Sequence, residues 1–359
     1  MASIALERGD VIVGVDTHKD QHVAVAVDGL GGDLEDCCVP ATNDGYAELL
    51  AWASGVGRVV AFGVEGCGSY GIGLARFLRR HGHRVVEVTR PPRKGERRLE
   101  GKSDLIDARH AAREVLAGRA NAVPKAADGL VESVRLVKIA RDTAVKAHTT
   151  AMITLKAVLV TATDELRARL EPLTDFGLVT ACAALADSLD PDRMVAAPQD
   201  AMRHALAALA RRWLTLHEEI KVHSRQLKAL TRTAAPQLVE AFGIGPDIAG
   251  ELLAAAGDNT DRVHSEAAFA KLCGACPIPA GSGKTNGRHR LNRGGNRQAN
   301  AALYRCVIVR MRWHEPTITY VQRRTAEGLS KKEIIRCLKR FVAREVYALL
   351  PPPRPPQTT

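Results

Sequence analysis

Short apolar segments separated by polar turns dominate the N-terminal part of the chain. Short apolar runs bounded by turns predict strands, and apolar positions three or four residues apart predict helices. We expect five strands, at Val11 to Asp16, Val23 to Val27, Cys37 to Ala41, Arg58 to Val64 and Arg84 to Val88. We expect helices at Asn43 to Ser54 with Asn43 as N-cap, at Tyr70 to Arg80 closed by Gly82, and at Ser103 to Ala117 with Ser103 as N-cap. This order predicts an α/β domain with a mixed sheet.

The middle of the chain has helical periodicity. Asp128 to Ala162 predicts one long, basic, amphipathic helix, and a second helical pattern runs from Met202 to Ala229. The two patterns predict a coiled-coil-like arm or hairpin, a kind of element that commonly dimerises. A pair of solvated helices within one domain fits the same pattern.

The C-terminal third is predicted to be mainly helical. Leu238 to Gly257 is typical of two helices joined by a tight turn, and further helices are expected at Ala299 to Arg312 and Lys331 to Leu350. The Pro-rich end, Pro351 to Thr359, predicts a disordered tail. The expected domains are an α/β domain at 1–125, a helical arm at 126–232, a C-terminal domain at 233–350 and a tail at 351–359.

Charge distribution points to a polyanionic partner. The formal net charge is +11, and no Asp or Glu occurs from Ala267 to His314, a stretch with many Lys and Arg residues. Such a balance favours nucleic acid first and a membrane surface second. No long apolar run and no apolar leader segment is present, so we expect a cytoplasmic protein without membrane contact. Cys273 and Cys276 form one CxxC pair without two further matching ligands, which favours packing over a zinc site.

Four carboxylates stand out by their positions. Asp16 ends the first predicted strand, Glu65 follows the fourth, and Asp104 and Asp107 lie three residues apart on one predicted helix face. Clustered carboxylates repel one another and suit Mg²⁺ or Mn²⁺, which can assist phosphoryl transfer. Any one of them alone is more simply an ordinary surface acid, but the ordered set favours a metal site. His18 fits either a supporting group beside this site or an exposed turn residue.

Two glycine-rich segments lie in the basic C-terminal part. Gly243-Ile-Gly245-Pro246 resembles a helix-hairpin-helix turn that binds DNA backbones, although a tight helix connection explains it equally well. Farther on, Ser282 stands between two glycines among basic residues, so its hydroxyl could attack a phosphodiester; most Gly-Ser-Gly segments are flexible loops. A phosphate loop of an NTPase is excluded because its first glycine is absent. The candidate nucleic-acid contacts are Gly243, Gly245, Lys284, Arg288, Arg290, Arg293 and Arg297.

The combination of these motifs resembles the insertion-sequence transposases of the one-hundred-and-ten family, over roughly residues 11 to 350. The N-terminal motifs are Gly14-Val-Asp-Thr-His-Lys19, Gly63-Val-Glu-Gly66 and Lys102-Ser-Asp-Leu-Ile-Asp-Ala108. The C-terminal motifs are Gly243-Ile-Gly-Pro246, Leu272-Cys-Gly274 with Pro277, Ser282-Gly-Lys284 and Arg293-Gly-Gly-Asn-Arg297. In this family a RuvC-like (RNase H-like) domain precedes a transposase domain with a catalytic serine.

The resemblance implies a composite active site. Asp16, Glu65, Asp104 and Asp107 would bind Mg²⁺, with Mn²⁺ as an alternative, and Ser282 would be the nucleophile that forms a covalent link to a DNA end. It also implies donor and target DNA as substrates, a non-coding guide RNA, a homo-oligomer (dimer or tetramer) and a location at the bacterial nucleoid. Two other hypotheses remain open, a junction-resolving endonuclease that uses metal and water, and a non-catalytic nucleic-acid-binding protein.

Overall fold

The computed structural model describes residues 7–89, 103–186, 197–281, 289–292 and 294–352. Within these ranges the chain forms two compact units. The first contains the residues up to Ala127 together with Asn259–Arg262, and the second contains Asp128–Asp258 and Val263–Pro352. No helix among the described residues is long and apolar enough to cross a membrane. Most of the predicted C-terminal tail, 353–359, lies outside the described ranges.

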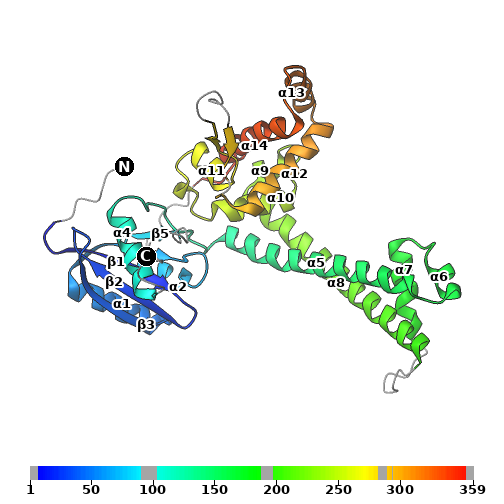
Figure 1. Ribbon diagram of the computed structural model, residues 1–359, viewed down its shortest axis with the longest axis horizontal. Helices are drawn as coiled ribbons and strands as arrows, with labels where there is room; N and C mark the ends of the chain where they lie inside the picture. The colour runs from blue at the N-terminus through cyan, green and yellow to red at the C-terminus, as the bar shows by residue number, and fades with distance from the viewer. Residues whose placement is uncertain (1–6, 90–102, 187–196, 282–288, 293, 353–359) are drawn as a thin grey trace. The chain divides into compact units, whose positions relative to one another are not determined.

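A five-stranded mixed sheet forms the centre of the first unit (Figure 1). Its strands are β1 (Asp10–Thr17), β2 (Gln21–Val27), β3 (Asp33–Pro40), β4 (Arg58–Glu65) and β5 (Val85–Val88), in the order β3-β2-β1-β4-β5. β2 is antiparallel to β1 and β3, whereas β4 is parallel to β1 and β5. The prediction of an α/β domain with a mixed sheet is therefore confirmed.

The two faces of the sheet are covered by different helices. α1 (Asn43–Val56) and α2 (Ile72–Arg80) pack on one face, in a core that includes Val13 and Val15 of β1. α4 (Asp104–Leu116) packs on the other face, in a core with Ile12 and Ala61. Because side chains alternate along a strand, Ile12, Gly14 and Asp16 of β1 all face α4.

The N-cap of α1 and the start of β3 differ from the sequence prediction. The N-cap of α1 is Thr42 rather than Asn43, because its hydroxyl oxygen accepts a hydrogen bond from the Gly45 backbone N–H at 3.2 Å. β3 begins at Asp33, four residues earlier than expected. It is an edge strand with mostly exposed residues, so its sequence lacks the apolar alternation that marks a half-buried strand.

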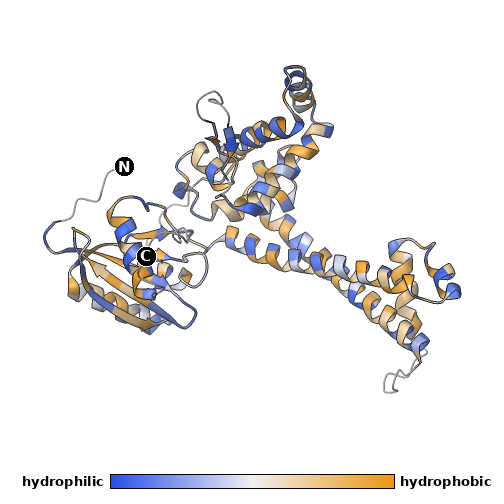
Figure 2. Ribbon diagram, in the orientation of Figure 1, coloured by the Kyte–Doolittle hydropathy of each residue, from blue (hydrophilic) through white to orange (hydrophobic). Residues whose placement is uncertain are grey.

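A long helical hairpin makes up one part of the second unit. α5 (Leu130–Val160) and α8 (Pro198–Ala234) pack side by side and form the predicted arm (Figure 1). Both helices carry hydrophobic and hydrophilic residues along their length (Figure 2). The short helices α6 (Asp164–Leu170), α7 (Asp175–Ala183) and η1 (Ala184–Ala186) lie between them in sequence, and α7 joins a core with Leu155, Leu206 and Trp213.

The rest of the second unit is mainly helical, as predicted. Its elements are α9 (Pro236–Glu240), α10 (Pro246–Ala256), α11 (Glu266–Leu272), β6 (Pro277–Pro279), β7 (His289–Leu291), α12 (Arg297–Trp313), α13 (Glu315–Ala326) and α14 (Lys331–Ala348). The short η2 turn (Thr260–Arg262) belongs to the first unit. A single apolar cluster joins α10, α11, α12 and α14, with Phe269 and Leu303 fully buried in it.

Gly14 and Gly63 set the distance between α4 and the sheet. The two glycines are partners in the parallel β1–β4 pair. A Cβ atom on Gly14 would lie 2.0 Å from the Ala108 carbonyl oxygen, and one on Gly63 would lie 2.8 Å from the Ala111 carbonyl oxygen. Backbone atoms of a helix cannot move aside as a side-chain end can, so neither position tolerates a larger residue without displacement of α4.

We therefore expect Gly14→Val to destabilise the first unit by at least about 1–3 kcal/mol, the usual cost of overpacking a core. Gly55→Ala is the control, because Gly55 is exposed on α1 and a Cβ there meets nothing within 4 Å. It should be neutral or stabilising by up to about 1 kcal/mol, since Ala favours helix. Chemical denaturation of the full chain measures both. Equal stability of Gly14→Val and the unchanged chain would contradict this packing.

Candidate functional site

Two buried carboxylates lie at the same edge of the sheet. Asp16 is the penultimate residue of β1 and Glu65 is the last residue of β4; the two side chains are only 3% and 5% exposed. β1 and β4 are parallel neighbours, so their carboxyl ends meet at one edge. Alternation also turns both residues toward the face that α4 covers, since Gly14 and Gly63 precede them by two positions. The sequence prediction that these acids converge matches this placement.

The first turn of α4 adds two more acids. Asp104 and Asp107 begin this helix, and Ser103 is its N-cap, although the Ser103 side chain makes no capping hydrogen bond. The Asp16 carboxylate feels the charges of Glu65, Asp107 and Asp104, and each raises its pKa. Because α4 packs closely on the sheet at Gly14 and Gly63, the acids of its first turn lie near Asp16 and Glu65.

His18 lies between two of these acids. Its Nε2 atom is 3.1 Å from Asp16 Oδ2 and 3.3 Å from Asp104 Oδ1. Ligand atoms of Asp16, His18 and Asp104 all lie within 4.8 Å of one another. The sequence did not decide whether His18 supports the site or is an exposed turn residue. The available signal was its position, because His18 follows Asp16 by two residues, directly after β1 ends at Thr17.

The end of β4 is fixed by a hydrogen bond from β1. The Thr17 hydroxyl donates to the Glu65 carbonyl oxygen at 2.8 Å. The next residue, Gly66, has a φ of 72°, in the left-handed region that favours glycine. A sharp turn therefore follows Glu65 directly, and the carboxylate remains at the sheet edge. Thr17 acts through the backbone of Glu65, a role that no pattern in the sequence indicates.

Burial and the neighbouring negative charges disfavour the ionised form of the Asp16 carboxyl. Desolvation raises its pKa above the ordinary value of 3.8, His18 lowers it, and the three neighbouring acids raise it further. A divalent cation reverses this balance, because it attracts all four carboxylates. The donor set, carboxylate oxygens with one imidazole nitrogen, suits Mg²⁺ or Mn²⁺. The residues present therefore fit a divalent metal.

The serine segment belongs to the second unit. β6 and β7 form an antiparallel hairpin, with Ile278 opposite Arg290. Ser282, Lys284, Arg288 and Arg293 lie outside the described residues. Arg290 is in β7 and Arg297 is the first residue of α12, and both line one pocket of the second unit. The structure therefore places two of the predicted basic contacts together.

The proposed helix-hairpin-helix turn joins α9 and α10. Gly243 has a φ of 76°, and Gly245 is the N-cap of α10. The Arg310 guanidinium donates to the Phe242 carbonyl oxygen at 2.8 Å, which ties the turn to α12. The turn is thus held in a fixed conformation that requires glycine at position 243.

An acid follows this turn in the first turn of α10. Asp247 Oδ1 is 2.8 Å from Lys138 Nζ and 3.0 Å from Arg141, and its Oδ2 is 3.1 Å from Arg305. Burial alone would raise the pKa of Asp247, but the hydrogen bond from Lys138 and the nearby cations lower it. The network joins α5, α10 and α12 and gives the start of α10 a negative side chain of its own. A role of Gly243 and Gly245 in DNA binding stays a prediction.

Cys273 is a core residue. It is fully buried in the apolar cluster around α10 and α12, and burial raises the pKa of its thiol to about 12. Cys276 is half-buried beside it in sequence. Among the described residues, the group with metal-ligand geometry consists of Asp16, His18 and Asp104.

Two family models match the chain. One is a transposase model for the DEDD transposases of IS110, which matches residues 13–163. The other is described as "Transposase IS116/IS110/IS902 family" and matches residues 235–322. Together they cover both the acidic site and the segment with Ser282. The chain belongs to the IS110 family of transposases. It is a DNA transposase enzyme, and its mixed sheet with the acids at one edge is compatible with the RNase H-like fold of the DEDD type.

Curated relatives agree with this family. The transposase is 24% identical to the insertion element IS116 uncharacterized 44.8 kDa protein of Streptomyces clavuligerus, over 94% of each chain. It is 26% identical to the insertion element IS110 uncharacterized 43.6 kDa protein of Streptomyces coelicolor, over 46% of this chain and 41% of that one. The first similarity spans nearly the full length of both proteins.

The acidic site generates a prediction for metal and pH. Because the folded-state pKa of Asp16 is raised, its stabilising contribution is present below the ordinary value of 3.8 and is lost as the pH rises through the raised value. At neutral pH a bound Mg²⁺ should recover this loss and raise the melting temperature. At a hundred-fold excess over Kd, the metal contributes about 2.7 kcal/mol.

This effect should shrink as the pH is lowered toward the raised pKa of Asp16. Asp16→Asn should abolish the response to Mg²⁺ without lowering the melting temperature of the metal-free chain. Asp20 is exposed in the turn between β1 and β2. Asp20→Asn should therefore leave the response to Mg²⁺ unchanged. Differential scanning calorimetry with and without Mg²⁺ measures the melting temperatures of the unchanged chain and of both variants. An undiminished Mg²⁺ response in Asp16→Asn would refute the metal site.

Proposed function

We propose that the transposase cuts and rejoins DNA through Mg²⁺ held by Asp16, Glu65, Asp104 and Asp107, together with Ser282 as a covalent nucleophile. The observation that carries this proposal is the gathering of four carboxylates, two of them buried, at the end of β1, the end of β4 and the start of α4. Buried like charges cost free energy, and a site for phosphoryl transfer gives them a use. Family membership supports the assignment of the chemistry to DNA.

The acids of this proposed site differ in how the structure holds them. Asp16 and Glu65 are fixed by the strands and would serve as rigid ligands, whereas Asp104 is more exposed and faces solvent as well as the site. His18 would orient the Asp16 and Asp104 carboxylates through its ring nitrogen. The metal, when bound, neutralises charge on the phosphate and on the oxygen that leaves.

Ser282 would open the DNA strand by transesterification. Its hydroxyl oxygen forms a new bond to the phosphorus, the bond from phosphorus to a deoxyribose oxygen breaks, and that oxygen leaves with a proton as a free hydroxyl. The number of phosphodiester bonds is conserved, so rejoining needs no energy source. The glycines on either side of Ser282 and the acid-free basic stretch around it support this role.

The remaining partners are proposed on the same basis. A non-coding guide RNA that pairs with donor and target DNA fits a net charge of +11 and the family's chemistry. A homo-oligomer, dimer or tetramer, fits the long hairpin of α5 and α8. These substrates place the enzyme in the bacterial cytoplasm at the nucleoid. Sequencing of RNA that co-purifies with the chain tests the guide, since transcripts without enrichment of the element's flank would count against it.

A covalent protein–DNA adduct is the expected signature of this function. Full-length protein, with any RNA it retains, is incubated with Mg²⁺ and a nicked duplex that carries an element end, and the product is separated under denaturing conditions. We expect an adduct whose DNA maps to Ser282 by mass spectrometry. Ser282→Ala and Asp16→Asn should both reduce it by at least about 10³-fold, the usual effect of removing a catalytic group.

Ser54→Ala is the matched control, because Ser54 is exposed on α1 and its hydroxyl bonds only the Leu50 carbonyl oxygen. It should leave the adduct unchanged. Strand cleavage that persists in Ser282→Ala without an adduct would instead indicate an endonuclease that uses metal and water. Binding without cleavage under all metal conditions would indicate a non-catalytic nucleic-acid-binding protein.

A further inference from the structure

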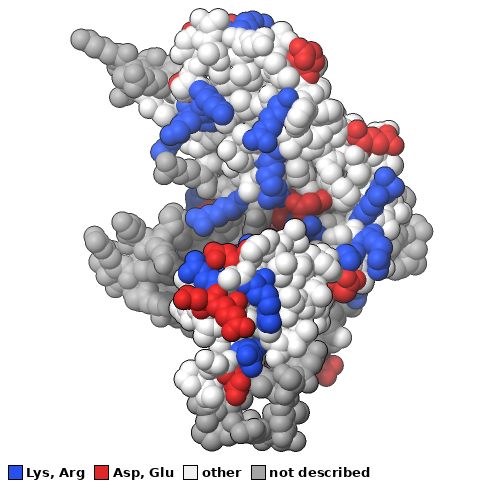
Figure 3. All heavy atoms as spheres, turned by 90° about the vertical axis from the view of Figure 1, so that its right-hand side faces the viewer, with Lys and Arg blue, Asp and Glu red and all other residues white. Residues whose placement is uncertain are grey.

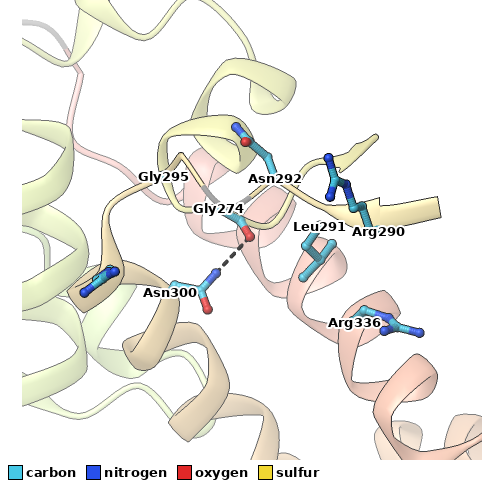
Figure 4. A pocket seen from close by; sticks show the side chains of 8 residues that line it. Gly274, Arg290, Leu291, Asn292, Gly295, Asn300 and Arg336 are labelled. Atoms are coloured by element: carbon cyan, nitrogen blue, oxygen red, sulfur yellow. Dashed lines mark hydrogen bonds between the residues drawn. The ribbon is translucent and has the colours of Figure 1, made fainter. Parts of the chain in front are cut away.

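A pocket of about 460 Å³ lies beside the hairpin that carries the serine segment. Five parts of the second unit line it: the turn after α11, β7 with the residue after it, the segment before α12, the start of α12, and α14 (Figure 4). The residues that matter here are Gly274, Arg290, Gly295, Arg297, Asn300 and Arg336. Arg336 comes from α14, far along the chain from the hairpin, and no motif pointed to it.

The charged side chains that line this pocket are all positive. Three guanidinium groups line it, those of Arg290, Arg297 and Arg336, and no carboxylate is among the lining residues. Within α14, one carboxylate oxygen of Glu333 lies 3.8 Å from the Arg336 guanidinium. The other carboxylate oxygen of Glu333 accepts hydrogen bonds from the backbone and hydroxyl of Ser330 in the capping box of α14. The Arg336 guanidinium therefore keeps donors for another acceptor.

Figure 3 shows one face of the molecule, on which Lys and Arg side chains are interspersed with Asp and Glu side chains. A buried cation also lies behind the pocket, because Lys339 is 7% exposed and donates to Asn300 Oδ1 at 2.6 Å. Burial lowers the pKa of Lys339, so its charge is most favourable when an anion is near.

The walls of the pocket are preorganised by backbone contacts. A Cβ on Gly295 would lie 2.2 Å from the Gly274 backbone nitrogen, so the two segments touch directly. The Asn300 amide donates to the Cys273 and Gly274 carbonyl oxygens at 2.9 and 2.8 Å, and Figure 4 draws the bond to Gly274. The Asn296 backbone N–H donates to the Leu272 carbonyl oxygen at 2.7 Å. A ligand therefore meets a fixed cationic surface and needs little reorganisation of the protein.

We infer that this pocket binds a backbone phosphate of the DNA substrate and that Arg336 is one of its ligands. The inference rests on the proposed function, because it takes the anion that binds in this pocket to be the DNA substrate. Guanidinium groups bind phosphate oxygens in a forked geometry, and several of them around one hollow fix the position of a phosphodiester. Arg336 thus acts as a positioning residue that holds the DNA strand against the β7 and α12 residues of this pocket.

Salt dependence of DNA binding tests this inference. Full-length protein is titrated against a DNA duplex that carries an element end, at several salt concentrations. Each phosphate contact contributes about 0.9 to the slope of log affinity against log salt, so Arg336→Gln should lower that slope by about 0.9. Arg336→Lys keeps the charge and should keep most of the slope. Equal melting temperatures of the variants show that each is folded.

Lys331→Gln is the matched control, since it removes one exposed positive charge from the same helix but does not line the pocket. Its slope should equal that of the unchanged chain. An unchanged slope in Arg336→Gln, or an equal loss in Lys331→Gln, would overturn the inference. A loss seen with RNA but not with DNA would overturn it as well. The covalent adduct at Ser282 in the unchanged chain is a separate readout, so the proposed function can stand while this inference fails, and the reverse.

Discussion

The contact between α4 and the sheet is the constraint on which the acidic site depends. Gly14 and Gly63 leave no room for a Cβ, and the helix backbone lies directly on β1 and β4 at these two positions. Because Asp16 and Glu65 follow the glycines by two residues, the same contact sets the distance from the strand acids to Asp104 and Asp107. One packing requirement therefore fixes both the fold of the first unit and the spacing of its four carboxylates.

At this edge of the sheet, the acids proposed to act in catalysis lower the stability of the metal-free protein. Asp16 is buried among three other acids, and its raised pKa reflects a fold that tolerates the charge poorly without a cation. The Thr17 hydrogen bond, the sharp turn at Gly66 and the position of His18 help to organise the surroundings of the acids.

Much of this arrangement could be predicted from the sequence, and the exceptions have physical reasons. Strand-end positions and a three-residue spacing were enough to pick Asp16, Glu65, Asp104 and Asp107, because periodicity determines which side a residue faces. The start of β3 was missed because an exposed edge strand has no apolar pattern. Arg336 was missed because tertiary packing alone brings α14 to β7. The role of His18 was open until the distances to Asp16 and Asp104 were known.

Anomalous X-ray diffraction from crystals of the full-length transposase grown with Mn²⁺ tests the central claim most directly. The account predicts an anomalous peak within coordination distance of the Asp16 and Glu65 carboxylates, with Asp104, Asp107 or His18 completing the ligand set, and loss of this peak in Asp16→Asn. A peak only at other residues, in crystals of a chain that remains active in strand transfer, would contradict the account.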